Sequence, residues 1–209
     1  MNKIFGASER RVERRNHLGK PAIVAIAVRT YDTNVDDLWE AITTPLRLAR
    51  WFMAVEGDLR LGGRYQLIGN AGGTITRCER PEALDVTWEM MGGTSWVNVR
   101  LAAAEGKAQL TLEHIAPEDG IGKDHLDKYG PGAVGVGWDL GLLGLERHLA
   151  DPSAAIDRAE VEAWTISANG KAFIRGSGEA WAEADTLGGE TAEEAQAKAA
   201  RTIAFYTGG

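Results

Sequence analysis

The sequence has a single cysteine among 209 residues, Cys78, so it can form no internal disulfide bond. Small secreted domains usually depend on several disulfides, whereas a chain of this length can bury a sizeable core without them. The sequence also shows no secretory signal peptide. These absences together predict a cytoplasmic protein.

Sequence motifs for metal, nucleotide and nucleophile chemistry are missing as well. The four histidines include no paired metal-binding motif and there is no second cysteine, so we expect no bound metal. No G-x-S-x-G, Walker A or Rossmann glycine motif occurs, and we expect no cofactor. The glycine-rich pieces NAGG and MGG lie between expected strands and are better explained as hairpin turns.

Positive charge is scarce, because 23 Lys and Arg residues against 30 Asp and Glu residues leave a net charge of −7. This balance argues against a nucleic-acid-binding surface. Residues 9–20 are the exception, and they bring four arginines close together: Arg10, Arg11, Arg14 and Arg15. We expect residues 1–20 to form an arm, as a solvated segment or a short helix, with binding of a phosphate or a partner as the alternative. The arm lacks the apolar face of a membrane-bound helix.

No apolar run is long enough to span a membrane, so we expect no membrane insertion. The best candidate, residues 131–149, is slightly short and is interrupted by charged residues. Its apolar residues recur at steps of three and four, which predicts a helix with one apolar face. They are Val134, Trp138, Leu142, Leu145 and Leu149. Pro131 suits the first turn of such a helix, where its missing N–H is not needed.

Four glycines lie inside this expected helix, namely Gly135, Gly137, Gly141 and Gly144. Each costs a helix about 1 kcal/mol relative to alanine. Two explanations remain open: close packing of the helix on a sheet, or space for a ligand beside the helix.

Seven segments ahead of this helix have the pattern of β-strands. They are residues 22–31, 56–61, 64–69, 74–79, 83–90, 95–103 and 107–115. Two short helices, at residues 35–42 and 45–50, follow the first strand, and short turns join the others into an antiparallel meander. An apolar sheet face must be covered, and residues 131–149 form the only long element nearby. The sequence therefore predicts an α+β fold, a curved antiparallel sheet around one long helix, with a cavity between them.

Beyond residue 150 the composition shifts to alanine and acidic residues, which predicts three further helices. The first begins at Asp151-Pro152 and ends at an Asn169-Gly170 C-cap, and the third begins at a Thr191 N-cap with Glu194. The second carries Phe173, Ile174, Trp181 and Ala184. These helices have too few large apolar residues to fold alone. We therefore expect an N-terminal arm (1–20), a sheet-and-helix domain (21–150) and a helical extension (151–209) that packs on the domain or on a second subunit.

Strand parity and the aromatic residues indicate which side chains face the cavity. Trp88 on the sheet and Trp138 on the helix are the best candidates for facing walls, with an indole N–H as a polar handle. The residues expected to line a ligand site are Phe52, Trp88, Met90, Val99, Leu112, His114, Trp138 and Leu142. We assign no catalytic residue beyond His114 as a candidate.

The remaining titratable residues allow more than one interpretation. A neutral His114 could hold a ligand hydroxyl or act as a general base, and a hydrogen-bonded structural histidine is the alternative. Glu89 and Glu113 fall on the face away from the cavity, while Asp139 is a third carboxylate that could belong to a site. His148 is expected to place positive charge at a helix C-terminus, with His17 and His125 in loops.

Five phrases in this order resemble the homologues of the activator of the heat-shock-protein-ninety ATPase, within the START-like, polyketide-cyclase-like helix-grip superfamily. The phrases are VRTYDTNVDDLWEAITTPLRLARWF, DLRLGGRY, LDVTWE, LTLEH and GVGWDLGLLGLERHL. The resemblance covers about residues 22–149, and the extension resembles that of a bacterial subgroup. It implies a seven-stranded antiparallel sheet that grips a C-terminal helix. Members bind lipids, hormones or polyketides, and a few catalyse cyclisation or hydrolysis. The co-chaperone activity belongs to a longer eukaryotic protein with an additional domain.

A fold does not define a function, and these observations leave three functions open. The first is binding of a small apolar or amphipathic molecule between sheet and helix. The second is an enzyme of the cyclase or hydrolase type with His114 as acid–base. The third is a co-chaperone-like or homodimeric interaction protein that uses the C-terminal helices.

Overall fold

The computed structural model describes residues 9–154 and 157–208, which form one antiparallel sheet of eight strands and seven helices. The strands are β1 (Glu9–His17), β2 (Lys20–Tyr31), β3 (Val55–Gly57), β4 (Arg64–Leu67), β5 (Gly72–Glu79), β6 (Ala83–Met90), β7 (Gly93–Ala104) and β8 (Lys107–Pro117). The helices are α1 (Val35–Thr43), α2 (Pro45–Trp51), α3 (Lys123–Tyr129), α4 (Gly132–Ala150), α5 (Arg158–Ile166), α6 (Ala168–Leu187) and α7 (Ala192–Thr207).

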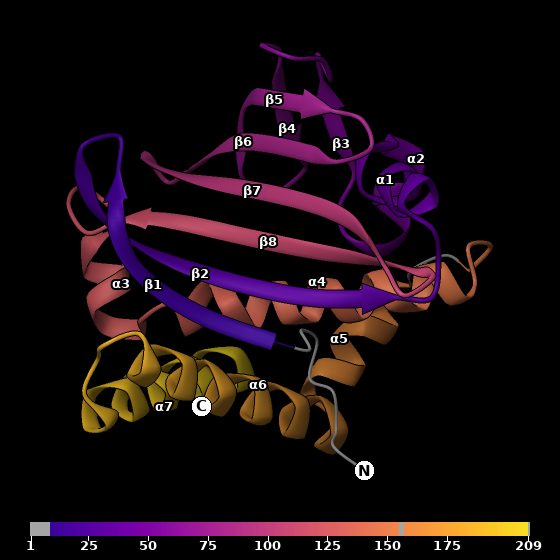
Figure 1. Cartoon of the computed structure of the whole chain (residues 1–209). Coiled ribbons are helices and arrows are strands. Elements are labelled where there is room, and N and C mark those ends of the chain that lie inside the picture. Colours follow the sequence, from indigo (N-terminus) through magenta and orange to yellow (C-terminus); the bar gives the residue numbers. More distant parts are fainter. Residues whose placement is uncertain (1–8, 155–156, 209) are drawn as a thin grey trace.

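The sheet confirms the α+β helix-grip fold, with one strand more than the seven expected. Its strand order is β1-β2-β8-β7-β6-β5-β4-β3, so β1 and β3 are the edges of an open sheet. Helix α4 runs along one face of the sheet, and α1 and α2 lie at one end (Figure 1). The helix expected at residues 131–149 is thus confirmed as α4.

The additional strand is β1, and the expected solvated arm or short helix at residues 9–20 is wrong. Residues of β1 pair with β2 from Glu9 opposite Val28 to His17 opposite Lys20. The arginines therefore alternate between two faces of a strand. Arg11 forms an exposed ion pair with Glu9, whereas Arg10 reaches inward to α4. Residues 1–8 of the expected arm lie outside the described residues.

Strand β3 is shorter than the expected strand at residues 56–61. The chain turns after Gly57, because Arg60 N donates to Asp58 O and Gly63 N donates to Arg60 O. A Cβ at Gly63 would lie 2.0 Å from Asp58 O, so this turn requires glycine. Most residues of the expected strand therefore lie in a turn, even though their apolar and charged side chains alternate.

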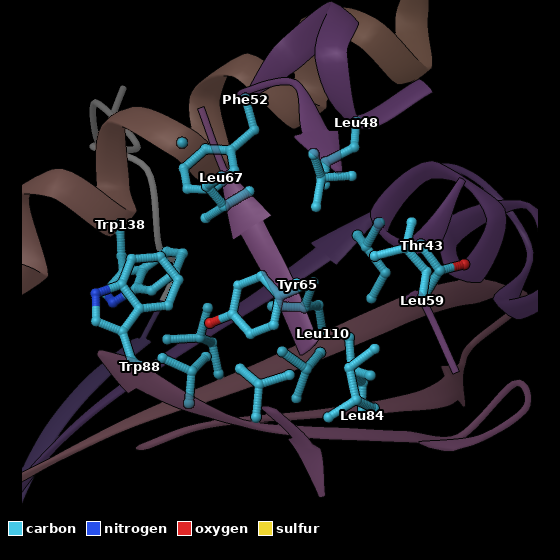
Figure 2. Close-up of a pocket in the computed structure, with 18 of the residues that line it drawn as sticks. Thr43, Leu48, Phe52, Leu59, Tyr65, Leu67, Leu84, Trp88, Leu110 and Trp138 are labelled. Atoms are coloured by element: carbon cyan, nitrogen blue, oxygen red, sulfur yellow. The ribbon is translucent and has the colours of Figure 1, made fainter. Parts of the chain in front are cut away.

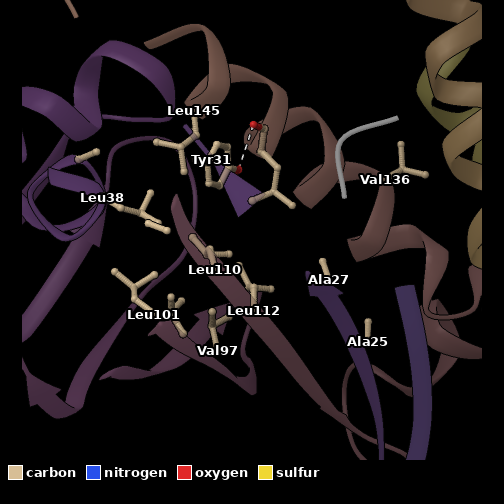
Figure 3. Packing of buried hydrophobic residues seen from close by; sticks show 14 of the residues in the cluster. Ala25, Ala27, Tyr31, Leu38, Val97, Leu101, Leu110, Leu112, Val136 and Leu145 are labelled. Atoms are coloured by element: carbon tan, nitrogen blue, oxygen red, sulfur yellow. Dashed lines mark hydrogen bonds between the residues drawn. The ribbon is translucent and has the colours of Figure 1, made fainter. Parts of the chain in front are cut away.

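The main core extends from the sheet through α4 to the C-terminal helices. Side chains of β2, β7 and β8 pack against α1 and α4 (Figure 3). Tyr31 donates a hydrogen bond of 3.2 Å to Leu142 O within this core. Asn34 is the N-cap of α1, and its side chain accepts from Asp37 N at 2.9 Å.

The C-terminal helices form a further layer, in which α6 packs against α4 and β1 (Figure 1). The expected C-cap at Asn169-Gly170 is wrong, because both residues lie in the first turn of α6. Ser167 is its N-cap and accepts from Gly170 N at 3.2 Å. The expected cap of α7 is confirmed, since Thr191 Oγ1 accepts from Glu194 N at 3.2 Å.

Two histidines expected in loops lie in regular structure. His17 ends β1, and His125 lies in α3, a short helix with no buried residue that had no clear sequence signal. Within the part of the chain that the structure describes, no helix is both long and apolar enough to cross a membrane.

Candidate functional site

A cavity of about 180 Å³ lies between the sheet and helices α1, α2 and α4. Most of its wall is aliphatic or aromatic, and it draws on six strands, β3 to β8, as well as on the three helices (Figure 2). The sheet contributes Val55, Tyr65, Leu67, Ile75, Cys78, Leu84, Val86, Trp88, Val97, Val99, Leu110 and Leu112. The helices and their ends contribute Ile42, Thr43, Leu48, Trp51, Phe52, Trp138, Gly141 and Leu142, and Leu59 completes the wall.

The two ends of the cavity differ in character. At one end the rings of Trp88 and Trp138 meet edge to face, with centroids 5.3 Å apart, and Phe52 stacks on Trp138 at 5.8 Å. At the opposite end lie Thr43 and Leu59 (Figure 2). Leu59 is 39% exposed, so this end is nearer to solvent.

Four polar side chains of the cavity wall donate hydrogen bonds to groups within the protein. Tyr65 donates to Thr87 O at 2.8 Å, and burial raises the pKa of its hydroxyl, so Tyr65 stays a neutral donor. The other donors do the same: Thr43 Oγ1 to Trp39 O at 2.7 Å, Trp51 Nε1 to Ala41 O at 2.9 Å and Trp138 Nε1 to His114 Nδ1 at 3.1 Å. The expected polar handle of Trp138 is therefore already used, and the wall presents an almost wholly apolar surface.

His114 lies behind Trp138 and does not line the cavity. Its Nδ1 accepts from Trp138, and its Nε2 lies 3.0 Å from Ser95 Oγ. Because Nδ1 is an acceptor, the ring is neutral with its proton on Nε2. Burial lowers the pKa of His114 to about 4. Both nitrogens are occupied and the ring resists protonation, so the arrangement favours the structural role over the acid–base role.

Six of the eight expected site residues line the cavity, and they include the facing pair Trp88 and Trp138. Besides His114, the exception is Met90, whose place in the cavity was wrong. Met90 is 47% exposed because it ends β6 at the hairpin to β7, where parity no longer points under the helices. Among the residues not singled out, Tyr65 and Leu67 share one face of β4, as their alternation predicted, and that face is the cavity wall.

Asp139 lies on the side of α4 away from the cavity, and its side chain is completely buried. Its Oδ2 accepts from Arg10 Nε at 3.0 Å, from Trp181 Nε1 at 3.1 Å and from Ser177 Oγ. These donors come from β1 and α6, so one carboxylate joins three elements far apart in the chain. Asp139 is therefore a structural residue in this fold and no part of the cavity.

The glycines of α4 serve mainly for close packing, although against helices and not against the sheet. A Cβ at Gly135 would lie 2.3 Å from the Trp181 ring, and one at Gly144 would lie 2.6 Å from Trp51 O. Gly141 differs, because its Cβ would make an ordinary contact of 3.6 Å with Phe52 inside the cavity wall. Close packing was therefore expected correctly but against the wrong partner, while Gly141 adjoins the cavity.

The other expected charged residues lie outside the cavity wall. Glu89 pairs with Arg64, and Glu113 pairs with Arg15. His148 is buried next to Arg47, and burial followed by the charges of Arg47 and Arg50 lowers its pKa. His148 is therefore neutral at pH 7 and does not supply the expected positive charge. The described residues contain no group of three metal-ligating side chains.

Comparison with known proteins identifies relatives of this fold. The sequence profile described as "Activator of Hsp90 ATPase homolog 1-like protein" matches residues 32–150. The crystal structure of CalU16 from Micromonospora echinospora is 33% identical, with a TM-score of 0.67 over 84% of this chain and 96% of that chain. A conserved protein of unknown function from Enterococcus faecalis, EF2215, is 21% identical, with a TM-score of 0.55 over 78% of this chain and 92% of that one. The latter supports the fold alone. Among curated proteins, none matches this chain.

Proposed function

This chain belongs to the Activator of Hsp90 ATPase homolog 1-like family, and from that premise and the apolar cavity we propose that it binds a small apolar molecule between the sheet and α4. The observation that supports the proposal most directly is a cavity whose wall is almost wholly aliphatic and aromatic. Such a wall offers a ligand mainly apolar contact, and four of its donors are already bonded within the protein. The family name describes a co-chaperone activity and supplies no argument for one in this chain.

The cavity limits the size and chemistry of this ligand. An apolar cavity of about 150 Å³ in another protein stays free of water and binds benzene. The cavity here, about 180 Å³, is of that class and suits a compact aromatic or branched aliphatic group. Trp88, Trp138 and Phe52 favour an aromatic ring at their end through edge-to-face and stacked contacts. A larger amphipathic molecule would have to leave its polar part at the end near Thr43 and Leu59.

Calorimetric titration of the protein with benzene and toluene tests the proposal. A side chain at Gly141 would enter the cavity beside Phe52, so Gly141→Leu should weaken toluene binding at least about tenfold. Gly141→Ala is the matched control, because it adds one methyl group in ordinary contact and should keep most of the affinity. Equal affinity in Gly141→Leu and the unsubstituted protein would place the ligand elsewhere.

Native mass spectrometry of the protein purified from its own host tests the same proposal with the natural ligand. The expected result is a bound small molecule whose mass identifies its chemical class. A protein that is empty and also fails to bind toluene would contradict the proposal.

The two other functions remain without a supporting observation in the site. His114 as acid–base is disfavoured by its occupied nitrogens and its pKa of about 4. A homodimer through the C-terminal helices stays a prediction. Trp181 and Ile174 of α6 pack in the core of this chain. The boundaries at residues 20 and 150 and the cytoplasmic location also stay predictions.

A further inference from the structure

Helix α2 forms part of the cavity wall, and its apolar side chains are at most partly buried. Leu48 and Trp51 from this helix, with Phe52 directly after it, face the cavity. None of the residues of α2 is fully buried. The helix lies between two joints, Thr44, which ends α1 and caps α2, and Phe52, whose backbone (φ −126°, ψ −94°) leaves the helical region. It is therefore a short wall segment with non-helical backbone at both of its ends.

Two arginines on the outer face of α2 tie it to the rest of the protein. Arg47 donates to the Asp37 carboxylate at 2.7 Å and, through Nε, to His148 Nε2 at 3.2 Å. Arg50 donates to the backbone oxygens of Pro152 and Ser153 at 2.8 and 3.1 Å. We refer to Arg47 and Arg50 with these acceptors as the latch. It joins α2 to α1 and to the C-terminal end of α4.

The closed position of α2 also depends on a glycine beneath it. A Cβ at Gly144 would lie 2.6 Å from Trp51 O, a backbone atom that cannot move without the helix. The absence of a side chain there lets the end of α2 contact α4 directly. An alanine at this position would act as a wedge between the two helices.

We propose that α2 is a lid over the apolar cavity, held closed by the latch, and that a ligand enters and leaves when α2 moves away from α4. The proposal rests on the function proposed above, because it assigns a route to the same cavity. Its geometric basis is the latch on the outer face, the cavity on the inner face and the glycine contact at the end of the helix.

The latch contains one group that makes it sensitive to acid. Arg47 Nε can only donate, so His148 Nε2 must be unprotonated, which leaves the buried Nδ1 to carry the proton without a hydrogen-bond partner. The charged groups that act on His148 are Arg47 and Arg50 from α2 and Asp37 from α1. Protonation would remove the acceptor of Arg47 and add a third cation beside the two arginines. Acid should therefore weaken the latch and open the lid.

NMR measurement of benzene exchange between free and bound states tests the lid. The double substitution Arg47→Ala with Arg50→Ala should raise both the association and the dissociation rate at least about tenfold, because one charge-assisted hydrogen bond changes an opening equilibrium by about that factor and this variant removes several. Gly144→Ala should also raise both rates, because the added methyl group would separate α2 from α4. Arg60→Ala is the control, since Arg60 is an exposed arginine paired only with Asp58. Unchanged rates in both the latch and the wedge variants would overturn the lid.

Hydrogen exchange separates this inference from the proposed function. In the absence of any ligand, the amide hydrogens of α2 should exchange faster in the latch variant, while those of β8 should not change. Accelerated α2 exchange without benzene binding would contradict the binding function and leave the movable helix supported. Normal benzene binding with α2 amides as protected in the variant as in the original protein would contradict the lid alone.

A third variant tests the acid sensitivity. His148→Gln keeps an acceptor for Arg47 but cannot titrate. As the pH falls below the ordinary histidine pKa of about 6.5, benzene exchange should accelerate in the unsubstituted protein and stay constant in His148→Gln. An equal acceleration in both proteins would exclude His148 as the sensitive group.

Discussion

The two sides of α4 use the same kinds of residue for opposite purposes. We define the cavity face by Trp138, Gly141 and Leu142, and the clamp face by Gly135 and Asp139. On the cavity face the glycine adjoins empty space, and the indole N–H of Trp138 turns away to His114. On the clamp face the Trp181 ring packs directly against Gly135, and Asp139 accepts from Arg10 of β1 and from Ser177 and Trp181 of α6.

This difference shows how one helix can leave space on one side without becoming unstable. A cavity loses the packing contacts of the atoms that would fill it. The clamp face compensates with dense packing and a buried carboxylate whose partners come from distant segments. A buried charge of this kind is strongly destabilising when a partner is removed. We therefore expect substitutions on the clamp face to act on stability and those on the cavity face to act on binding.

The largest expected effect is that of Asp139→Ala on the clamp face. It would leave Arg10, Ser177 and Trp181 without their common acceptor, and should lower the free energy of unfolding by about 3–5 kcal/mol. Urea denaturation measures this change. Arg11→Ala, which breaks the exposed pair with Glu9, is the control and should change stability by no more than about 0.5 kcal/mol. A similar small change in Asp139→Ala would refute the clamp.

The second effect concerns pH and the aromatic end of the cavity face. The pKa of His114 in the folded protein, about 4, lies below its ordinary value near 6.5, so the unfolded chain binds the proton more readily. The stabilisation is present above pH 6.5 and is lost as the pH falls towards 4, by about 3 kcal/mol in total.

The substitution His114→Gln isolates this contribution from those of the other histidines. Glutamine can accept from Trp138 and donate to Ser95 but does not titrate. Denaturation at several pH values should show a shallower loss of stability in the variant between pH 6.5 and 4. Parallel curves for the two proteins would show that His114 does not have its lowered pKa.

The third prediction applies one substitution to both faces. Gly135→Ala should destabilise the protein by about 1–3 kcal/mol, because its Cβ would lie 2.3 Å from the Trp181 ring. Gly141→Ala should instead be neutral or stabilise by up to about 1 kcal/mol, because the helix gains alanine and the new Cβ meets only Phe52 at 3.6 Å. Thermal unfolding of the two variants side by side measures the contrast. Equal destabilisation would remove the distinction between the faces.

The smallest effect is expected from a pair of ligands of similar size. Phenol should bind about tenfold more weakly than toluene, because the almost wholly apolar wall would not replace the hydration that its hydroxyl loses. Calorimetric titration of both compounds against the unsubstituted protein tests this. Tighter binding of phenol would reveal a polar anchor within the cavity.

Much of the arrangement of the sheet around α4 could be predicted, because the sequence patterns that indicate it are local. The alternation of Leu84, Val86 and Trp88 identifies one face of β6, and the spacing of Trp138 and Leu142 identifies the facing side of α4. Adjacent antiparallel strands keep these faces aligned, so residues of different strands meet in one cavity. Parity failed at Met90 because a strand end can extend beyond the layer that covers it.

The clamp could not be predicted, because its partners are far apart in the chain. Arg10 and Asp139 are separated by 129 residues, and no local pattern links them. The closely spaced arginines of β1 were interpreted as a charged arm. Arginines that alternate along a strand can instead form ion pairs on both faces of that strand. The signal that the sequence offered was Asp139 itself, a charged residue among apolar ones, because a buried charge requires partners.

The central claim is that the two faces of α4 differ in what they can bind, and titration with benzene followed by NMR tests it most directly. The indole N–H resonances of Trp88 and Trp138 report on the cavity, and that of Trp181 reports on the clamp face. We predict saturable shifts of the Trp88 and Trp138 resonances while that of Trp181 stays constant. A shift at Trp181 alone, or no shift at any of the three, would contradict the account.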